Sequence, residues 1–263
     1  MEKPNEKVFG MYAEYYDLLY KDKNYDAETD YVVSLLKKYM PEANSLADLG
    51  CGTGKHAVEF AKRGYKVTGV EMSESMLNIA KKNLSGAGIE EKNVKYICGD
   101  ISKIDTGEKY DAALALFHVI GYLTSNALLL QGIRNISRHL NKGGLLIFDY
   151  WYGPAVLAQK PERRSKLLKG NGLALRRNAE PELKVNENIV EVNYNIEVKA
   201  DTGEILLLDE KHSMRYFFLP EIKLLLEQCG FKVLLNKEWI TGNELSEESW
   251  SGLCVAKFDP MNT

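Results

Sequence analysis

The chain has 263 residues, of which 45% are hydrophobic and 27% charged, and its formal net charge at pH 7 is −3. This is ordinary globular composition, and the length is sufficient to bury a large core without disulfide or metal support. The slightly acidic balance, without a basic stripe, argues against a nucleic-acid partner. No apolar stretch reaches the length of about 18 residues that a membrane span needs, and the first residues lack a signal peptide's hydrophobic core. We therefore expect a soluble, cytoplasmic protein without a membrane partner.

The four cysteines are scattered along the chain. None forms a CxxC pair or a metal-ligand spacing with histidine, so no metal site is predicted. Cys98 and Cys254 lie in apolar runs, and we interpret them as small core residues rather than reactive thiols.

From residue 25 to residue 151, helical periods alternate with short apolar runs. A tyrosine-rich lead-in precedes the first helical period, which covers residues 25–39 and is ended by Pro41. Further helices are expected at residues 55–64, 73–88 and 128–144. Strands are expected at residues 45–50, 66–71, 94–100 and 145–151, and another begins at residue 110. This alternation favours a parallel sheet covered by helices on both faces.

The pattern changes after Trp151, where apolar and polar residues alternate without a long helical period. The segment ADTGE at residues 200–204 predicts a hairpin turn, so we expect antiparallel strands inserted into the α/β core. A helix follows at residues 219–231, with proline in its first turn and glycine just past its end. Two closing strands are expected at residues 232–240 and 251–258.

A glycine-rich loop, DLGCGTG at residues 48–54, follows the first predicted strand. A P-loop would need glycine in place of Leu49, and Ser or Thr in place of His56, so that reading fails. A dinucleotide loop would have its third glycine at Lys55, and the acid Asp48 would repel a pyrophosphate. S-adenosylmethionine carries a sulfonium and an ammonium but no phosphate, and glycines let its methionine part lie against the backbone. The loop therefore predicts S-adenosylmethionine as the cofactor.

Two acids at the tips of the next strands fit the same cofactor. Glu71, about 20 residues after the loop, is placed to bind ribose hydroxyls. Asp100 can accept a hydrogen bond from the adenine amine, with Ile101 beside the ring. Each feature alone is common in turns and on surfaces. Their combination in register with the alternating fold is specific, because open α/β sheets bind ligands at the carboxyl ends of their strands.

Four segments carry a family resemblance: residues 48–82, GDISKI at 99–104, YDAALALFHVIGYL at 110–123, and residues 214–233. Together they resemble the class I S-adenosylmethionine-dependent methyltransferases. The resemblance implies a Rossmann-like α/β fold with a seven-stranded, mainly parallel sheet of order 3-2-1-4-5-7-6 and helices on both faces. Its last strand, supplied by residues 251–258, would be antiparallel, and the antiparallel β insertion would follow strand five.

A narrower resemblance rests on the lead-in at residues 12–36, on FDYWYGPAVL at 148–157, and on the β insertion followed by MRYFFL. These are similar to the nucleotide-sugar N,N-dimethyltransferases that make aminosugars such as desosamine and mycaminose. That similarity implies an aminosugar nucleotide as the small-molecule acceptor and an antiparallel sheet that helps to wall the sugar site. The family's usual double tryptophan is Tyr150-Trp151 in this chain.

We expect a single methyltransferase domain over residues 1–263, made of four segments. These are a lead-in that forms a lid at residues 1–44, a cofactor-binding core at 45–150, the antiparallel insertion near the acceptor site at 151–216, and a C-terminal helix with closing strands at 217–263. An exposed edge strand of the insertion is compatible with a homodimer.

The candidate cofactor-binding residues are the glycine loop, the acids that flank it and nearby aromatic and apolar groups. They are Tyr16, Tyr25, Asp48, Gly50, Cys51, Gly52, Gly54, Glu71, Met72, Asp100, Ile101 and Phe117. Tyr16 and Tyr25 would close over the sulfonium and stabilise it by cation–π contact. Alternatively, these tyrosines only attach the N-terminal helix to the core.

The acceptor side is expected after strand four and at the tip of strand five. His118 and Tyr122 are the candidate catalytic residues. His118 takes the acceptor proton or only positions a ligand by hydrogen bonding, and we favour positioning. Tyr122 orients the acceptor or packs on the next helix. The candidate substrate-binding residues are Trp151, Tyr152 and Arg215, of which the arginine binds a phosphate in bidentate fashion or forms a structural ion pair.

We therefore expect an enzyme that transfers a methyl group from S-adenosylmethionine to the amine of an aminosugar nucleotide. The amine must be neutral to attack, so its proton passes to water or to a nearby base, and no metal is required. Two alternatives stay open: a methyltransferase for another small amine or hydroxyl acceptor, and a protein that binds S-adenosylmethionine without catalysis.

Overall fold

The computed structural model describes residues 18–170 and 172–260. Within this part the chain divides into two compact units. Residues 24–159 and 215–260 form one, called here the α/β unit; residues 18–23 and 160–214 form the other, called the antiparallel unit. No helix among the described residues is long and apolar enough to cross a membrane.

The sheet of the α/β unit has the expected class of topology. Its parallel strands run in the order β3 (Val94–Cys98), β2 (Lys66–Glu71), β1 (Ser45–Leu49), β4 (Tyr110–Ala115) and β5 (Leu140–Tyr152). β11 (Ser251–Phe258) then lies antiparallel between β5 and β10 (Phe231–Glu238). Counting β10 and β11 as the sixth and seventh core strands, this confirms the predicted Rossmann-like arrangement. The order differs in one respect, because the end of β9 (Ile205–Phe217) also pairs with β5.

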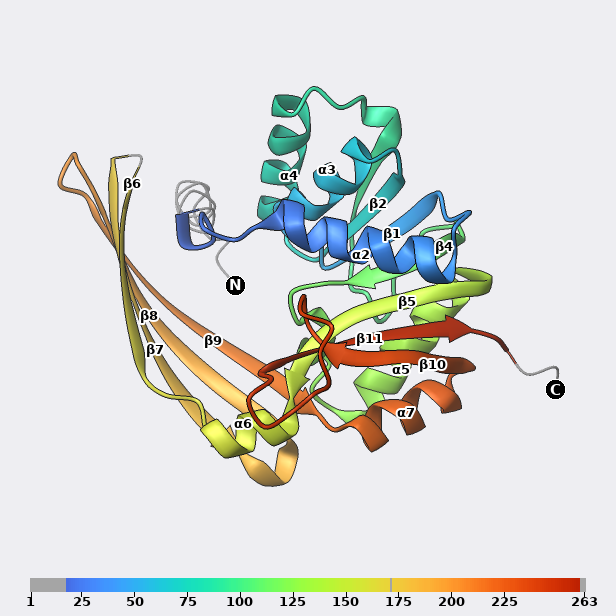
Figure 1. Cartoon of the computed structure of the whole chain (residues 1–263). Helices are drawn as coiled ribbons and strands as arrows, with labels where there is room; N and C mark the ends of the chain where they lie inside the picture. Colours follow the sequence, from blue (N-terminus) through green and yellow to red (C-terminus); the bar gives the residue numbers. More distant parts are fainter. Residues whose placement is uncertain (1–17, 171, 261–263) are drawn as a thin grey trace. The chain divides into compact units, whose positions relative to one another are not determined.

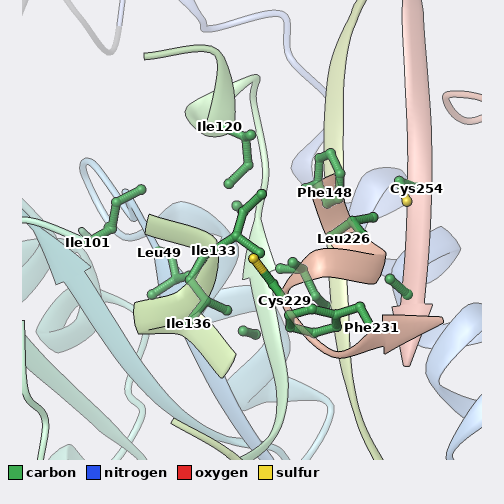
Figure 2. Packing of buried hydrophobic residues seen from close by; sticks show 14 of the residues in the cluster. Leu49, Ile101, Ile120, Ile133, Ile136, Phe148, Leu226, Cys229, Phe231 and Cys254 are labelled. Atoms are coloured by element: carbon green, nitrogen blue, oxygen red, sulfur yellow. The ribbon is translucent and has the colours of Figure 1, made fainter. Parts of the chain in front are cut away.

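Helices cover both faces of this sheet (Figure 1). One face carries α2 (Tyr25–Tyr39), α3 (Lys55–Lys62) and α4 (Glu74–Gly86); the other carries α5 (Asn126–Arg138) and α7 (Leu219–Gln228). Because successive strand residues point to opposite faces, Leu114 belongs to the first core and Ala115 to the second. Figure 2 shows the second core, where Ile133 of α5 and Leu226 of α7 pack near Phe148 of β5.

Most predicted helix boundaries are confirmed, but one is wrong. The helix expected at residues 128–144 ends at Arg138, and the chain enters β5 at Leu140. The reason is a long-range pairing: the Tyr110 N–H donates to the His139 carbonyl at 2.8 Å, and Tyr110 pairs with Leu140. The glycines at 143 and 144 therefore lie within the long β5 strand.

The antiparallel unit contains the predicted insertion. Its strands are β6 (Arg164–Gly170), β7 (Leu173–Lys184), β8 (Ile189–Ala200) and most of β9, in that order. The predicted hairpin joins β8 to β9, where the Gly203 N–H donates to the Ala200 carbonyl at 2.9 Å. Apolar residues on one face of β7 and β8 pack against Leu18 and Leu19, which gives this unit its own small core.

The remaining elements are short. They are η1 (Glu91–Asn93), η2 (Val119–Tyr122), α6 (Gly153–Gln159) and η3 (Val185–Glu187).

Asp111, near the start of β4, holds the beginnings of β1 and β5 in place. Its Oδ2 accepts from the backbone N–H groups of Asn44 and Ser45, each at 3.0 Å, and its Oδ1 accepts from Asn141 Nδ2 at 3.0 Å. Burial raises the pKa of this carboxyl, but the hydrogen bonds outweigh that effect and leave the pKa below its usual value. Asp111 therefore stabilises the fold in its ionised form.

We expect Asp111→Asn to lower the free energy of unfolding at pH 7 by about 1–2 kcal/mol, because bonds to a charged acceptor are lost. The pKa is lower in the folded than in the unfolded state. The contribution is therefore present above the unfolded value of about 4 and is lost as the pH falls through the folded value. Urea unfolding of both proteins should show a gap at pH 7 that shrinks near pH 3. A gap that does not change with pH would contradict this account.

Candidate functional site

The loop between β1 and α3 carries three glycines in the left-handed region of backbone space. Their φ angles are +68° at Gly50, +53° at Gly52 and +72° at Gly54, values that strain most other residues. A Cβ at Gly54 would lie 2.3 Å from Oη of Tyr96, and one at Gly50 would lie 2.6 Å from Cγ2 of Val119. At Gly52 a Cβ would meet no described heavy atom within 4 Å. Gly50 and Gly54 are thus required by protein packing, and Gly52 leaves open space beside the backbone.

Glu71, at the end of β2, binds this loop directly. Its Oε2 accepts from the Gly52 N–H at 3.1 Å, and its Oε1 accepts from the Ser73 N–H at 3.0 Å. The Glu71 carbonyl accepts from the Gly99 N–H at 2.9 Å. The structure therefore brings the glycine loop, Glu71 and the segment after β3 together at the carboxyl ends of three neighbouring strands, as the sequence predicts.

Asp48, the residue before the end of β1, is a buried acid with an incomplete set of partners. It is 2% exposed, and its Oδ2 has no hydrogen-bond partner among the described residues. Burial raises the pKa of Asp48 to about 6, while His56 lowers it and Glu71 raises it by smaller amounts. A buried carboxyl without a full set of partners is costly, and a positive charge nearby would favour its ionised form. This environment suits a cationic ligand at the loop.

The other predicted cofactor residues occupy more varied positions. The Tyr25 ring packs edge-on against His56 at 4.9 Å between ring centres. Met72 is 69% exposed, whereas Cys51 and Ile101 are buried. Oδ1 of Asp100 accepts from the backbone and hydroxyl of Ser102, each at 2.8 Å. Their contacts with a ligand stay predictions, as does the role of Phe117.

The interpretation of Cys98 as a core residue is wrong, because it ends β3 in an exposed position. Its Sγ lies 3.5 Å from the Met72 carbonyl. Tyr16, the proposed lid residue, lies outside the described residues.

After β4 the backbone is strained. Phe117 and His118 have φ angles of +72° and +63°, and two consecutive residues other than glycine in this region are uncommon. Each costs on the order of 1–3 kcal/mol unless the surroundings impose it. The cause is visible in the sheet: β4 pairs with β5 as far as Phe148, and Trp151 and Tyr152 pair instead with the end of β9. The chain must therefore turn away from the sheet at Phe117.

Asp149 on β5 supports this turn and was not among the predicted site residues. It is 1% exposed, and its Oδ1 accepts from the His118 N–H at 3.0 Å. Its Oδ2 lies 2.8 Å from Nδ1 of the His118 ring, an ion-pair distance, although the ring is not aligned for a hydrogen bond. The sequence held a signal for it, since an acid inside the apolar run LLIFDYW needs a partner once buried.

Aromatic rings gather around His118. The ring centres of His118 and Trp151 are 5.9 Å apart, and those of Trp151 and Trp250 are 6.2 Å apart. Phe117 lies 5.8 Å from His118 by the same measure. The structure thus brings together three of the predicted residues, and it adds Trp250, which the sequence analysis missed.

The last predicted acceptor residues differ in setting. Tyr122 ends η2 and is 49% exposed. The Tyr152 N–H donates to the Trp250 carbonyl at 3.0 Å. Arg215 forms a buried ion pair with Glu221, which was the alternative to a phosphate-binding role. Phosphate binding by Arg215 stays a prediction.

The cofactor loop and the His118 segment are in direct contact. Val119, the residue after His118, packs against Gly50 so closely that a methyl group there would displace it. The His118–Asp149 pair and the glycine loop therefore form one site at the carboxyl ends of β1, β2, β4 and β5.

The raised pKa of Asp48 predicts a pH-dependent affinity for S-adenosylmethionine. Below about pH 6 the carboxyl is protonated, so affinity should fall by up to about tenfold per pH unit. For the protein alone the sign is opposite: the folded state holds the proton more tightly, so the stabilisation from Asp48 is present at low pH and lost as the pH rises through about 6. Calorimetric titration from pH 5 to 8 measures the affinity. Asp48→Asn should bind weakly at every pH, and a variant that keeps the wild-type slope would refute the assignment.

The different surroundings of two glycines predict different defects. Gly54→Ala should destabilise the protein by about 2–4 kcal/mol, because backbone strain adds to a collision with Tyr96. Gly52→Ala should cost only about 1–2 kcal/mol of strain but should weaken S-adenosylmethionine binding, because its methyl enters the open space at the loop. Urea unfolding and calorimetric titration of the two variants test this contrast. Wild-type affinity in Gly52→Ala would show that the cofactor lies elsewhere.

Comparisons with known proteins find similarity to methyltransferases. Residues 46–144 match the family described as a methyltransferase domain. The chain is 28% identical over 225 residues to dTDP-3-amino-3,4,6-trideoxy-alpha-D-glucopyranose N,N-dimethyltransferase of Streptomyces venezuelae, covering 84% of this chain and 90% of that one. It is 34% identical over 145 residues to dTDP-4-amino-2,3,4,6-tetradeoxy-D-glucose N,N-dimethyltransferase of Saccharopolyspora spinosa, covering 54% and 55% of the two chains.

A solved structure confirms the fold. An S-adenosylmethionine-dependent methyltransferase from Clostridium acetobutylicum is similar to this chain with a TM-score of 0.82, over 96% of this chain and 99% of that one, at 19% identity. The matched family region, residues 46–144, contains the glycine loop, Glu71 and His118. The fold, the cation-compatible loop and the family match together identify the chain as an S-adenosylmethionine-dependent methyltransferase.

Proposed function

We propose that this methyltransferase acts on the amine of a nucleotide-linked aminosugar. The observation that carries the proposal is the His118–Asp149 pair, which lies beside the cofactor loop through the contact of Val119 with Gly50. An amine acceptor has to lose a proton, and this pair offers a place for it. The aminosugar is supported by the relatives from S. venezuelae and S. spinosa, which are named for dTDP-aminosugars.

The residues at the loop fit the cofactor. Asp48, beside the glycine loop, would balance the positive charge of the cofactor, and Glu71 and Asp100 would bind the ribose and the adenine amine. Tyr25 would contribute to a lid over the cofactor. When bound, S-adenosylmethionine supplies an electrophilic methyl group on a positively charged sulfur.

His118 accepts the acceptor proton in this proposal. A carboxylate 2.8 Å from Nδ1 favours a proton on that nitrogen, which leaves Nε2 as the basic atom. The same carboxylate stabilises the imidazolium once the second proton has arrived. The buried partner thus favours a base over the positioning role that sequence alone suggested. Tyr122 orients the amine.

Trp151 and Tyr152 form the wall of the acceptor site, and the Trp250 ring packs edge-on against Trp151. Bulky rings around a histidine exclude water, which strengthens the electrostatic interaction between His118 and Asp149 and aligns the acceptor for in-line transfer.

The four free cysteines fit a reducing compartment, so we propose that the enzyme is cytoplasmic. A homodimer through an edge of the insertion belongs to the same proposal.

The proposal is tested with labelled S-adenosylmethionine and a panel of dTDP-aminosugars, unlinked aminosugars, amino acids and hydroxylated rings. We expect label transfer to a dTDP-aminosugar. His118→Gln should lower kcat by about 10²–10⁴-fold, the usual contribution of a general base, while leaving the affinity for S-adenosylmethionine within about twofold.

Asp149→Asn serves as the matched control, because it keeps the shape of the side chain and removes its charge. It should lower kcat less than His118→Gln and move the pH profile of kcat. If the enzyme methylates another amine or a hydroxyl compound and none of the sugars in the panel, the acceptor is not an aminosugar. Cofactor binding without turnover of any acceptor would favour a non-catalytic protein.

A further inference from the structure

A buried arginine binds the C-terminal end of the segment that carries His118. Arg215 is 7% exposed, and its Nη1 donates to the Thr124 carbonyl at 3.2 Å. Its Nη2 pairs with Oε1 of Glu221 in the first turn of α7. The other Glu221 oxygen accepts from the Phe218 N–H at 3.4 Å, at the start of the same helix. The Arg215–Glu221 ion pair and the bond from Arg215 to Thr124 therefore connect the segment before α5, the end of β9 and the start of α7.

The segment from Phe117 to Thr124 needs such anchors because its first two residues are strained. Asp149 holds the His118 N–H at its beginning. Ile120 is buried in the core, and Leu123 packs against Gly132 of α5 so closely that a Cβ there would lie 2.6 Å away. At its end, the Thr124 carbonyl is held by Arg215. A strained conformation persists only when its surroundings define it at both ends.

We propose that Arg215 and Glu221 are positioning residues that hold the segment 117–124 in the conformation that presents His118. The inference rests on the role of His118 proposed above. It assigns Arg215 a different function from phosphate binding. Two of its nitrogens already serve Thr124 and Glu221, and its Nε is buried without a partner among the described residues. Little of the guanidinium is exposed to receive an anion.

The test uses protein labelled with ¹⁵N in its histidines, of which there are four. The His118 ring resonances are sensitive to the nearby charge of Asp149 and the ring of Trp151 without any acceptor, and His118→Gln assigns them. Two variants separate positioning from stability. Arg215→Met leaves Glu221 without its partner, which lowers stability. Arg215→Met combined with Glu221→Met removes both charges, so it should recover part of that stability, although the Phe218 N–H at the start of α7 loses its acceptor, while the Thr124 carbonyl still lacks its donor.

We expect the His118 resonances to move in both variants while those of His56 and His139 stay in place. With an acceptor that is turned over, kcat should fall at least about tenfold in both, and the dissociation constant for S-adenosylmethionine should change less than about twofold. Arg63→Met is the matched control: Arg63 pairs with Asp26, Asp30 and Glu59, and its loss should leave the His118 resonances unchanged.

Unmoved His118 resonances in the double variant would overturn the proposal even if the protein were inactive. If the resonances stay but the affinity for dTDP falls in Arg215→Met, the arginine binds phosphate instead. If the His118 resonances move in the two variants but the wild-type protein methylates no compound of the panel, the positioning role is supported and only the proposed acceptor is contradicted.

Discussion

The site depends on a missing side chain at Gly50. Val119 occupies the space where a Cβ would be, so the cofactor loop and the His118 segment touch through backbone and one valine side chain. Because protein interiors are close-packed, a contact of this kind restricts the distance between the two elements. In the proposed mechanism the loop holds the methyl donor and His118 is the base, so this contact would keep the two in the alignment that a displacement reaction requires.

Around this contact the fold buries three charged groups at the ends of strands. Asp149 and Arg215 are largely satisfied by His118, Thr124 and Glu221. Asp48 is not, and its pKa is raised to about 6 by burial. The contrast separates two uses of a buried charge. The paired groups hold backbone in place, while the incompletely paired acid is ready for a ligand that brings a positive charge.

The pairing of β5 first with β4 and then with β9 explains why the backbone at Phe117 and His118 is strained. β5 extends beyond β4, and its last residues are paired by β9, the strand that returns from the antiparallel unit. Phe117 and His118 therefore cannot continue along β5 and adopt left-handed backbone. The edge pairing that displaces the His118 segment from the sheet comes from Tyr216 and Phe217, which belong to the α/β unit. Arg215, the residue before them, anchors the same segment.

Sequence predicted the arrangement of the glycine loop and Glu71 better than that of the residues around His118, because the first set is close together in the chain and the second is not. Gly50, Gly52, Gly54 and Glu71 lie within 22 residues, and each has a local signature: a glycine where backbone approaches closely, an acid at a strand's end. The wrong helix end at residue 144 came from a pairing of Leu140 with Tyr110, which no local pattern reveals.

His118 and Asp149 are 31 residues apart, and Arg215 is 91 residues from Thr124. No local pattern around either residue of such a pair indicates its partner. The sequence therefore left His118 as either a proton acceptor or a positioning residue, and Arg215 as either a phosphate-binding residue or part of an ion pair. What the sequence did contain was an anomaly, an acid in a buried strand. A buried carboxylate has to be paired, and β5 has neighbours on both edges, β4 and β11. Among the residues just after Ala115, where β4 ends, His118 is the one able to carry a proton, and it is the partner that the structure shows.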